Sequence, residues 1–88
     1  MKLRYTAQAE KDLKYLPKTV ADRILNKMDW YIASDDPLHF AKALVTPRQR
    51  LYRFEIGDYR AICRITNGEI TILLVLPVRN RKDTYWDF

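Results

Sequence analysis

The sequence has little of what a disulfide framework or a nucleotide site requires. One cysteine (Cys63) and two glycines occur in 88 residues. A single cysteine cannot form an internal disulfide, and the apolar surroundings of Cys63 predict a small buried side chain rather than a reactive thiol. Two glycines are too few for the glycine-rich loops that bind the phosphates of ATP or dinucleotides. Nothing in the sequence therefore supports a nucleotide cofactor.

Metal ligands and membrane segments are scarce as well. The only histidine, His39, stands between Leu38 and Phe40 with no second ligand at a metal-binding spacing, so we expect it to be structural. The longest apolar run, residues 70–78, contains a threonine and a proline and is too short to span a bilayer. Residues 1–6 lack the apolar core of a signal peptide. We expect a cytoplasmic protein with no metal, cofactor or membrane role.

The charge pattern is the most informative feature that is present. The formal net charge is +5 and the pI is near 9.5, which favours an anionic partner. Seven of the nine arginines occur from Arg48 onward, whereas six of the seven lysines precede it. Arginine grips phosphate with a planar, permanently charged fork. Its concentration on strand-like sequence predicts a polyanion site, RNA above all.

The first half of the chain indicates helices. Eighty-eight residues form one domain, residues 1–88. The pattern predicts a short strand over 2–6, a helix over 7–16 that Pro17 ends, and a second helix over 18–33 with Thr19 as its cap. We expect the two helices to form a hairpin. Residues 35–47 are interpreted as a connector that holds a short helical turn around 39–44.

The second half indicates antiparallel strands. Period-two alternation predicts strands over 50–56 and 59–65, joined by a turn at Gly57 and Asp58. Asn67 and Gly68 are a strong hairpin signal, and residues 69–76 are nearly all apolar or β-branched, as in a central strand. The predicted class is α+β, with an N-terminal strand, a helical hairpin on one face of the sheet and a three-stranded antiparallel meander.

The other sheet face carries the candidate chemistry. The predicted register places Glu55 opposite Arg60, with Arg53 diagonal to them, and the tail can return Arg79 and Tyr85 to the same surface. Cleavage of RNA through its own 2′-hydroxyl needs a base, cations for the charge that develops on phosphorus, and an acid for the leaving oxygen. Further basic residues on this surface would bind RNA: Arg53, Arg64, Arg81 and Lys82.

These residues also have ordinary structural explanations. Glu55 and Arg60 can be a cross-strand ion pair worth about 0.2–1 kcal/mol, with the remaining arginines a solvated face. Tyr85 can pack against the sheet edge, and Trp86 and Phe88 can cover the core rather than stack on bases. From the residues alone, both explanations stay open.

The segment Leu-Tyr-Arg-Phe-Glu-Ile-Gly-Asp-Tyr-Arg (51–60), the hydrophobic strand after it and Arg-Asn-Arg-Lys-Asp-Thr-Tyr (79–85) resemble RelE-type toxins of bacterial toxin-antitoxin modules. The similarity extends over the whole chain. It implies a compact α+β fold and metal-independent cleavage of messenger RNA in the ribosomal A site. It also implies a cognate antitoxin that wraps and inactivates the toxin, and contact with operator DNA only through that complex.

The resemblance assigns roles residue by residue. Arg60 matches the phosphate-stabilising arginine, and Arg79 matches the arginine assigned to charge stabilisation or leaving-group protonation. Tyr85 matches the terminal tyrosine, assigned as base or stacking partner. Arg53 matches the first of two basic positions, but the second is Glu55 here, which removes a cation. In the related YoeB branch a glutamate is the general base, so Glu55 and Tyr85 both remain candidates.

Two other functions remain open. A ParE-like member of the same superfamily would share the fold but act on DNA gyrase, although Arg60, Arg79 and Tyr85 together favour the nuclease branch. An inactive member would only bind its antitoxin. For any of these functions, exposed apolar side chains at Leu51, Ile62 and Trp86 would be consistent with an antitoxin helix that docks nearby.

Overall fold

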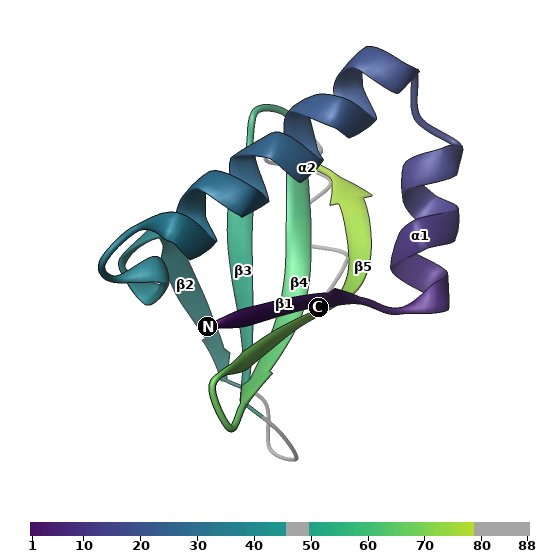
Figure 1. Cartoon of the computed structure of the whole chain (residues 1–88). Coiled ribbons are helices and arrows are strands. Elements are labelled where there is room, and N and C mark those ends of the chain that lie inside the picture. The colour runs from purple at the N-terminus through teal and green to yellow at the C-terminus, as the bar shows by residue number, and fades with distance from the viewer. Residues whose placement is uncertain (46–49, 79–88) are drawn as a thin grey trace.

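The computed structural model describes residues 1–45 and 50–78 as one five-stranded sheet with two helices and a 3₁₀ turn (Figure 1). The elements are β1 (Lys2–Tyr5), α1 (Ala7–Lys14), α2 (Lys18–Ala33), η1 (Pro37–Phe40), β2 (Ala41–Val45), β3 (Arg50–Ile56), β4 (Tyr59–Thr66) and β5 (Glu69–Pro77). The strand order is β1-β5-β4-β3-β2. The predicted α+β class, the order of strand, two helices and strands, and the antiparallel β3-β4-β5 meander are confirmed.

The helices bury one side each. In α2 the buried residues are Ile24, Met28 and Tyr31, which share one face at a helical spacing. The predicted cap at Thr19 is wrong, because the backbone oxygen of Pro17 accepts from the first turn and no side chain caps α2. The two helices are consecutive, as expected, but they spread apart from the turn between them, so that α2 alone crosses the sheet diagonally (Figure 1). No helix in the described ranges is long and apolar enough to cross a membrane.

Helix α1 covers the free edge of β5. Strand β1 runs parallel to β5 and pairs with it only as far as Tyr5 and Ile72. Beyond that point the Thr6 hydroxyl donates to the Leu73 carbonyl at 2.7 Å and accepts from the Ala9 N–H at 3.1 Å. One turn later, the Asp12 carboxylate accepts from the Val75 N–H at 2.9 Å. The cap of α1 and an acid on its second turn therefore provide hydrogen-bond partners for backbone groups at the free edge of β5. These groups lie next to the register shift between β4 and β5.

Both predicted tight turns have the backbone that their sequences require. Gly57 has φ +57° at the first loop position between β3 and β4, which is where a type II′ turn needs glycine. Asn67 (φ +50°) and Gly68 (φ +75°) are both left-handed, as in a type I′ turn. The Gly57 turn fixes the register in which Glu55 lies opposite Arg60.

The connector contains a strand that the sequence pattern did not predict. The expected short helical turn is present, but it lies earlier, at η1, and β2 then pairs antiparallel with β3 from Ala41 to Val45. Alanine favours helices and is depleted in strands, so the alternation of Ala41 and Ala43 with Lys42 and Leu44 is a weak strand signal. Pairing with β3, rather than local propensity, makes this segment a strand.

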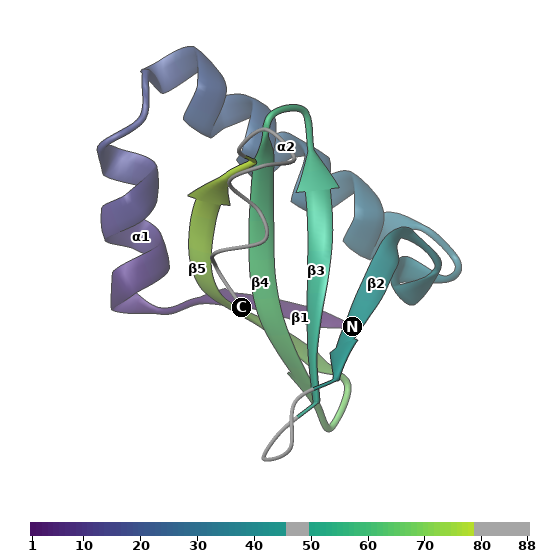
Figure 2. The same cartoon turned by 180° about the vertical axis from the view of Figure 1, so that it is seen from behind.

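The core lies between α2 and the sheet. Its fully buried side chains include Phe54, Ile70 and Ile72. An aromatic cluster extends from it: Tyr31 stacks between Phe54 (centroids 5.2 Å apart) and Phe40 (4.8 Å). His39 contacts Phe40 edge-on at 5.2 Å, a packing contact. The opposite face of the sheet has no helix over it among the described residues, as the reverse view shows (Figure 2).

Candidate nucleic-acid interface

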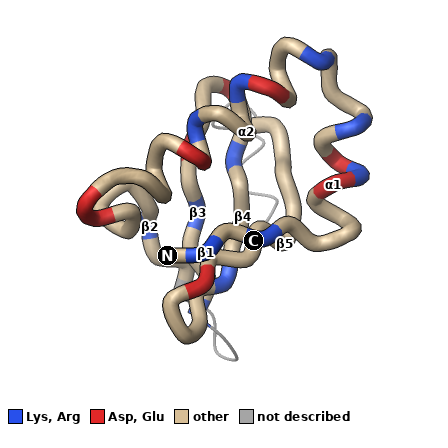
Figure 3. The backbone as a smooth tube through the Cα atoms, in the orientation of Figure 1, with Lys and Arg blue, Asp and Glu red and all other residues tan. Residues whose placement is uncertain are grey.

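The uncovered sheet face, hereafter the open face, carries the side chains that alternate with the core. On β4, Ala61 and Cys63 are buried, whereas Arg64 is exposed and Arg60 is half-buried. On β3, Phe54 and Ile56 are buried, so Arg53 and Glu55 lie on the open face. Basic positions recur along both strands (Figure 3). Arg53, Arg60 and Arg64 lie opposite the helices, as predicted, whereas Arg50 of β3 alternates onto the helix side.

The strand register arranges these residues in rows. Lys42, Arg53 and Ile62 are neighbours on β2, β3 and β4, and Glu55 is opposite Arg60 in the next row. Leu51 and Ile62 are half-buried rather than exposed, so they form an apolar floor between the cations. The open face is therefore a basic surface with an apolar centre, which suits a ligand that has both phosphates and flat bases.

The structure corrects one expected ion pair. Although Glu55 is opposite Arg60 in register, its Oε1 lies 3.3 Å from Nε of Arg53, two residues along the same strand. Among the described residues, no ion pair joins Glu55 to Arg60. The reason is geometric: side chains at i and i+2 of one strand point to the same face, and the long Arg53 side chain reaches back along it. Arg53, not Arg60, is the cation that holds Glu55.

The two central arginines are partly withdrawn from solvent. The Arg53 side chain is 23 % exposed, against 44 % for Glu55. The Nε atoms of Arg53 and Arg60 are both shielded, and neither makes an aligned hydrogen bond within the described ranges. Shielding strengthens the electrostatic attraction that each guanidinium exerts on an incoming anion.

Several expected site residues cannot be placed. Arg79, Arg81, Lys82, Tyr85 and Trp86 lie outside the described residues. The described part of the predicted site consists of Arg53, Glu55, Arg60 and Arg64, to which the structure adds Lys42 from the unpredicted strand β2.

Other titratable groups have structural roles. Burial raises the pKa of the Cys63 thiol to about 12, which keeps it protonated and unreactive, as its apolar surroundings predicted. Burial, with a smaller effect of the Asp29 carboxylate, raises the pKa of Tyr5 to about 12. Within residues 1–45 and 50–78, no group of three His, Cys, Asp or Glu side chains could hold a metal ion.

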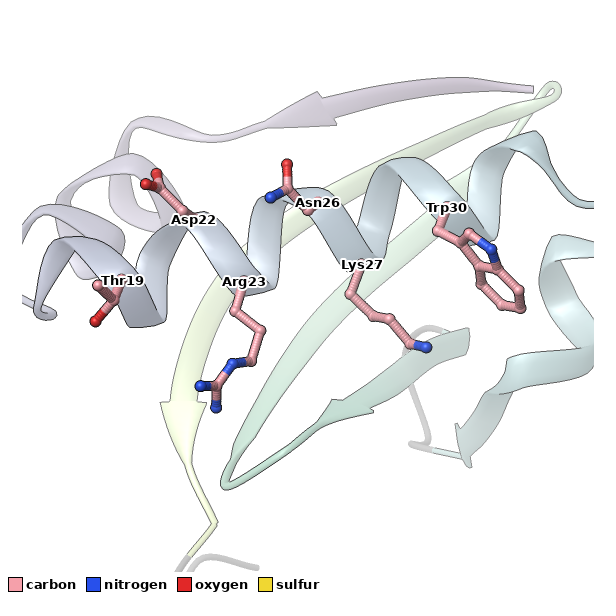
Figure 4. A pocket seen from close by; sticks show the side chains of 6 residues that line it. All are labelled: Thr19, Asp22, Arg23, Asn26, Lys27 and Trp30. Atoms are coloured by element: carbon pink, nitrogen blue, oxygen red, sulfur yellow. The ribbon is translucent and has the colours of Figure 1, made fainter.

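A groove along one side of α2, near the β3–β4 turn, was missed by sequence reasoning. It has a volume of about 620 Å³, and Arg23, Lys27 and Trp30 project into it from one side of the helix (Figure 4). Trp30 is 54 % exposed, and the Lys27 ammonium lies 4.5 Å from its ring centroid. The spacing i, i+4, i+7 was the available signal, but an aromatic residue at that spacing is also what a buried helix face shows.

Comparison with known proteins agrees with this architecture. A family model described as "ParE toxin of type II toxin-antitoxin system, parDE" matches residues 3–85. A search of curated proteins gives no match.

Solved structures with the same fold are toxins in complex with antitoxins. The RelBE2 toxin–antitoxin complex of Mycobacterium tuberculosis has 26 % identity and a TM-score of 0.72, over 86 % of this chain and 95 % of that chain. The archaeal RelE–RelB complex of Pyrococcus horikoshii has 29 % identity and a TM-score of 0.70, over 90 % and 96 %. The intact RelBE complex of E. coli (14 %, TM-score 0.66, over 90 % and 98 %) shares the fold. With a family match over nearly its full length and this fold, the chain belongs to the ParE toxin family of type II toxin-antitoxin systems, within the RelE/ParE superfamily.

Proposed function

We propose that this toxin cleaves messenger RNA in the ribosomal A site, without a metal ion, and so inhibits translation. The observation that supports this most strongly is the open face, where Arg60, Arg53 and Lys42 lie around one carboxylate opposite the helix-covered side of the sheet. A cationic surface with a single acid and an apolar floor matches the needs of phosphodiester cleavage.

The proposed reaction uses the 2′-hydroxyl of the RNA as the nucleophile. A base removes its proton, the oxygen attacks the adjacent phosphorus, and the bond to the 5′ oxygen of the next nucleotide breaks as that oxygen takes up a proton. Arg60 stabilises the charge that develops on the phosphate oxygens. Glu55 and Tyr85 are the two candidate bases, and Arg79 is the candidate acid or second charge stabiliser.

Glu55 is the base that the described geometry supports. Its carboxylate is on the open face, is accessible to a ligand, and is oriented by Arg53 at 3.3 Å. A Tyr85 base would need a phenol pKa far below its usual value of about 10, which neighbouring arginines would favour.

The ribosome is proposed to supply positioning. With so few catalytic groups, alignment of the attacking oxygen can contribute about 7–11 kcal/mol to lowering the barrier. We therefore expect cleavage of naked RNA to be slow. The protein would act in the cytoplasm and be held inactive by a cognate antitoxin, and operator DNA would be contacted only through that complex. The RelB partners in the similar structures support the antitoxin part of this proposal.

A second candidate is inhibition of DNA gyrase. The observation in its favour is the family match itself, which is to the ParE toxin model. A third, a member that only binds its antitoxin, would need no intact Arg60.

The test is primer extension on messenger RNA in a purified translation system, with and without ribosomes. The parent is compared with Arg60→Ala, Tyr85→Phe and the control Arg50→Ala, an exposed arginine of β3 that alternates onto the helix side of the sheet. We expect the parent to cut messenger RNA only when ribosomes are present. Arg60→Ala should lower the cleavage rate by about 10²-fold or more, whereas Arg50→Ala should cleave at the parental rate.

Two results would contradict the proposal. Rapid cleavage of linear RNA without ribosomes would remove the ribosome from the mechanism. No cuts from folded, antitoxin-free parent, together with loss of gyrase supercoiling activity when the toxin is added, would establish the gyrase function instead.

A further inference from the structure

A second cluster of cations lies on the open face, at the end away from Glu55. One row of residues crosses all five strands, and its members are paired neighbours: Leu44, Leu51, Arg64, Thr71 and Arg4. Thr71 on β5 is thus flanked by Arg64 on β4 and Arg4 on β1. This arrangement depends on the parallel pairing of β1 with β5, which brings an N-terminal arginine beside the meander.

The three side chains line a hollow. Its volume is about 520 Å³, and the rest of its lining includes Glu69 and residues of the edge strand β1. The Arg4 side chain is 73 % exposed, and its Nε is 3.8 Å from Oε2 of Glu69, a loose contact at the surface. Arg64 is also exposed. Both guanidinium groups are therefore available to a ligand that enters the hollow.

We propose that Arg4, Thr71 and Arg64 bind a phosphate of the RNA backbone, so that the strand runs from the Arg60 region down the open face; this rests on the proposed RNA function. Arg4 and Arg64 are two strand spacings apart, about 10 Å, which arginine side chains can close around one phosphate. Each fork binds one non-bridging oxygen, and the Thr71 hydroxyl donates a hydrogen bond between them.

The distance to the catalytic region fits a continuous path. Arg60 and Arg64 are four residues apart on β4, about 13 Å, with the half-buried Ile62 between them. A single strand of RNA can place one phosphate at each arginine and pack the intervening bases on Ile62 and Leu51. An acidic polypeptide would match the cations but not the flat apolar floor, so RNA is the favoured ligand.

Glu69 allows a test of whether the hollow binds a negatively charged ligand. Its carboxylate faces the same hollow and repels a phosphate while it attracts Arg4. Removing an arginine and removing Glu69 should therefore change RNA affinity in opposite directions. A purely structural role of the row would not produce this opposition.

The experiment measures binding of a short fluorescent single-stranded RNA with 2′-O-methyl groups, which blocks cleavage, across a series of KCl concentrations. The variants are Arg4→Gln, Arg64→Gln and Glu69→Gln, with Arg23→Gln in α2, on the helix-covered side of the sheet, as a control of equal charge change. Thermal unfolding checks that each variant is folded. One neutralised phosphate contributes about 0.7 to the slope of log affinity against log salt, so we expect Arg4→Gln and Arg64→Gln each to reduce the slope by part of this amount and the double variant to reduce it by about 0.7. Glu69→Gln should tighten binding, and Arg23→Gln should leave the slope unchanged.

The other outcomes are separable. A parent that binds no free RNA overturns this site, whereas the proposed cleavage on the ribosome stands or falls separately by the primer-extension test. A parent that binds RNA with slopes unchanged by Arg4→Gln, or reduced equally by Arg23→Gln, overturns only the site. If Arg4→Gln instead weakens binding of poly-L-glutamate and leaves RNA binding intact, the hollow takes an acidic polypeptide and the RNA assignment is wrong.

Discussion

At the scale of single residues, Glu55 carries two functions that one substitution can separate. As half of a partly exposed ion pair with Arg53, it contributes about 1 kcal/mol or less to stability. As a general base it would contribute about 10²–10⁴-fold to cleavage. We expect Glu55→Gln to lower ribosome-dependent cleavage by that factor while the unfolding free energy changes by less than about 1 kcal/mol, measured by primer extension and urea denaturation.

The matched control for Glu55 is Asp58→Asn, a nearby exposed acid in the β3–β4 turn. It lowers the negative charge by the same amount without touching the ion pair, so cleavage should stay near the parental rate. Parental cleavage by Glu55→Gln would transfer the role of base to Tyr85. An equal loss of cleavage in both variants would mean that the loss results from the change in net charge and not from removal of a general base.

At the scale of elements, a single hydroxyl makes two hydrogen bonds that stabilise the junction between α1 and β5. The Thr6 hydroxyl caps α1 through Ala9 and donates to the Leu73 carbonyl. Thr6→Val keeps the shape but removes the cap, worth about 1 kcal/mol, and leaves a partly buried carbonyl without its donor. We expect the unfolding free energy in urea to fall by about 1–3 kcal/mol. Thr19→Val, at an exposed position that caps nothing, should change it by less than about 0.5 kcal/mol.

Local signals account for the elements that the sequence predicted. The turns at Gly57 and at Asn67–Gly68 need left-handed backbone, and the strands beside them alternate strictly, so the meander and the face of each arginine follow from neighbours in sequence. Strand β2 and the pairing of β1 with β5 depend on partners far along the chain, and no local pattern specifies them. The same limit applies to the site: the open face was predictable, but the Arg53–Glu55 contact and the Arg4–Thr71–Arg64 row were not.

At the scale of the whole molecule, the two faces of the sheet have different roles, one in stability and the other in the proposed binding of RNA. The helix-covered face holds the core, with Phe54, Cys63 and Ile72 fully buried. The open face carries cations, which repel one another and are offset in the described structure mainly by Glu55 and Glu69. Bound RNA would relieve this repulsion, so ligand binding and folding stability should rise together.

Two buried groups should make the folded protein less stable at alkaline pH. Between their ordinary and their raised pKa values, these groups are protonated in the folded protein and ionised in the unfolded chain. Burial raises the pKa of Tyr5 from 10.0 and of Cys63 from 9.0, each to about 12. As pH rises, the unfolded chain loses these protons first, so their contribution is complete below about pH 9 and disappears as pH approaches 12. We expect the urea midpoint to fall across this window. Both protons should reappear as a titration of the unfolded state at the ordinary pKa values.

Tyr5→Phe isolates one of these contributions. The Tyr5 hydroxyl is buried and has no hydrogen-bond partner in the described part of the chain, so its removal should leave stability at pH 7 equal or slightly higher. Above pH 10 the variant should lose stability less steeply than the parent, because it has one fewer proton to release on unfolding. Tyr15→Phe, at a side chain that is 79 % exposed, is the control and should follow the parental curve. If Tyr5→Phe and the parent lose stability in parallel between pH 10 and 12, the Tyr5 hydroxyl reaches water in the folded protein.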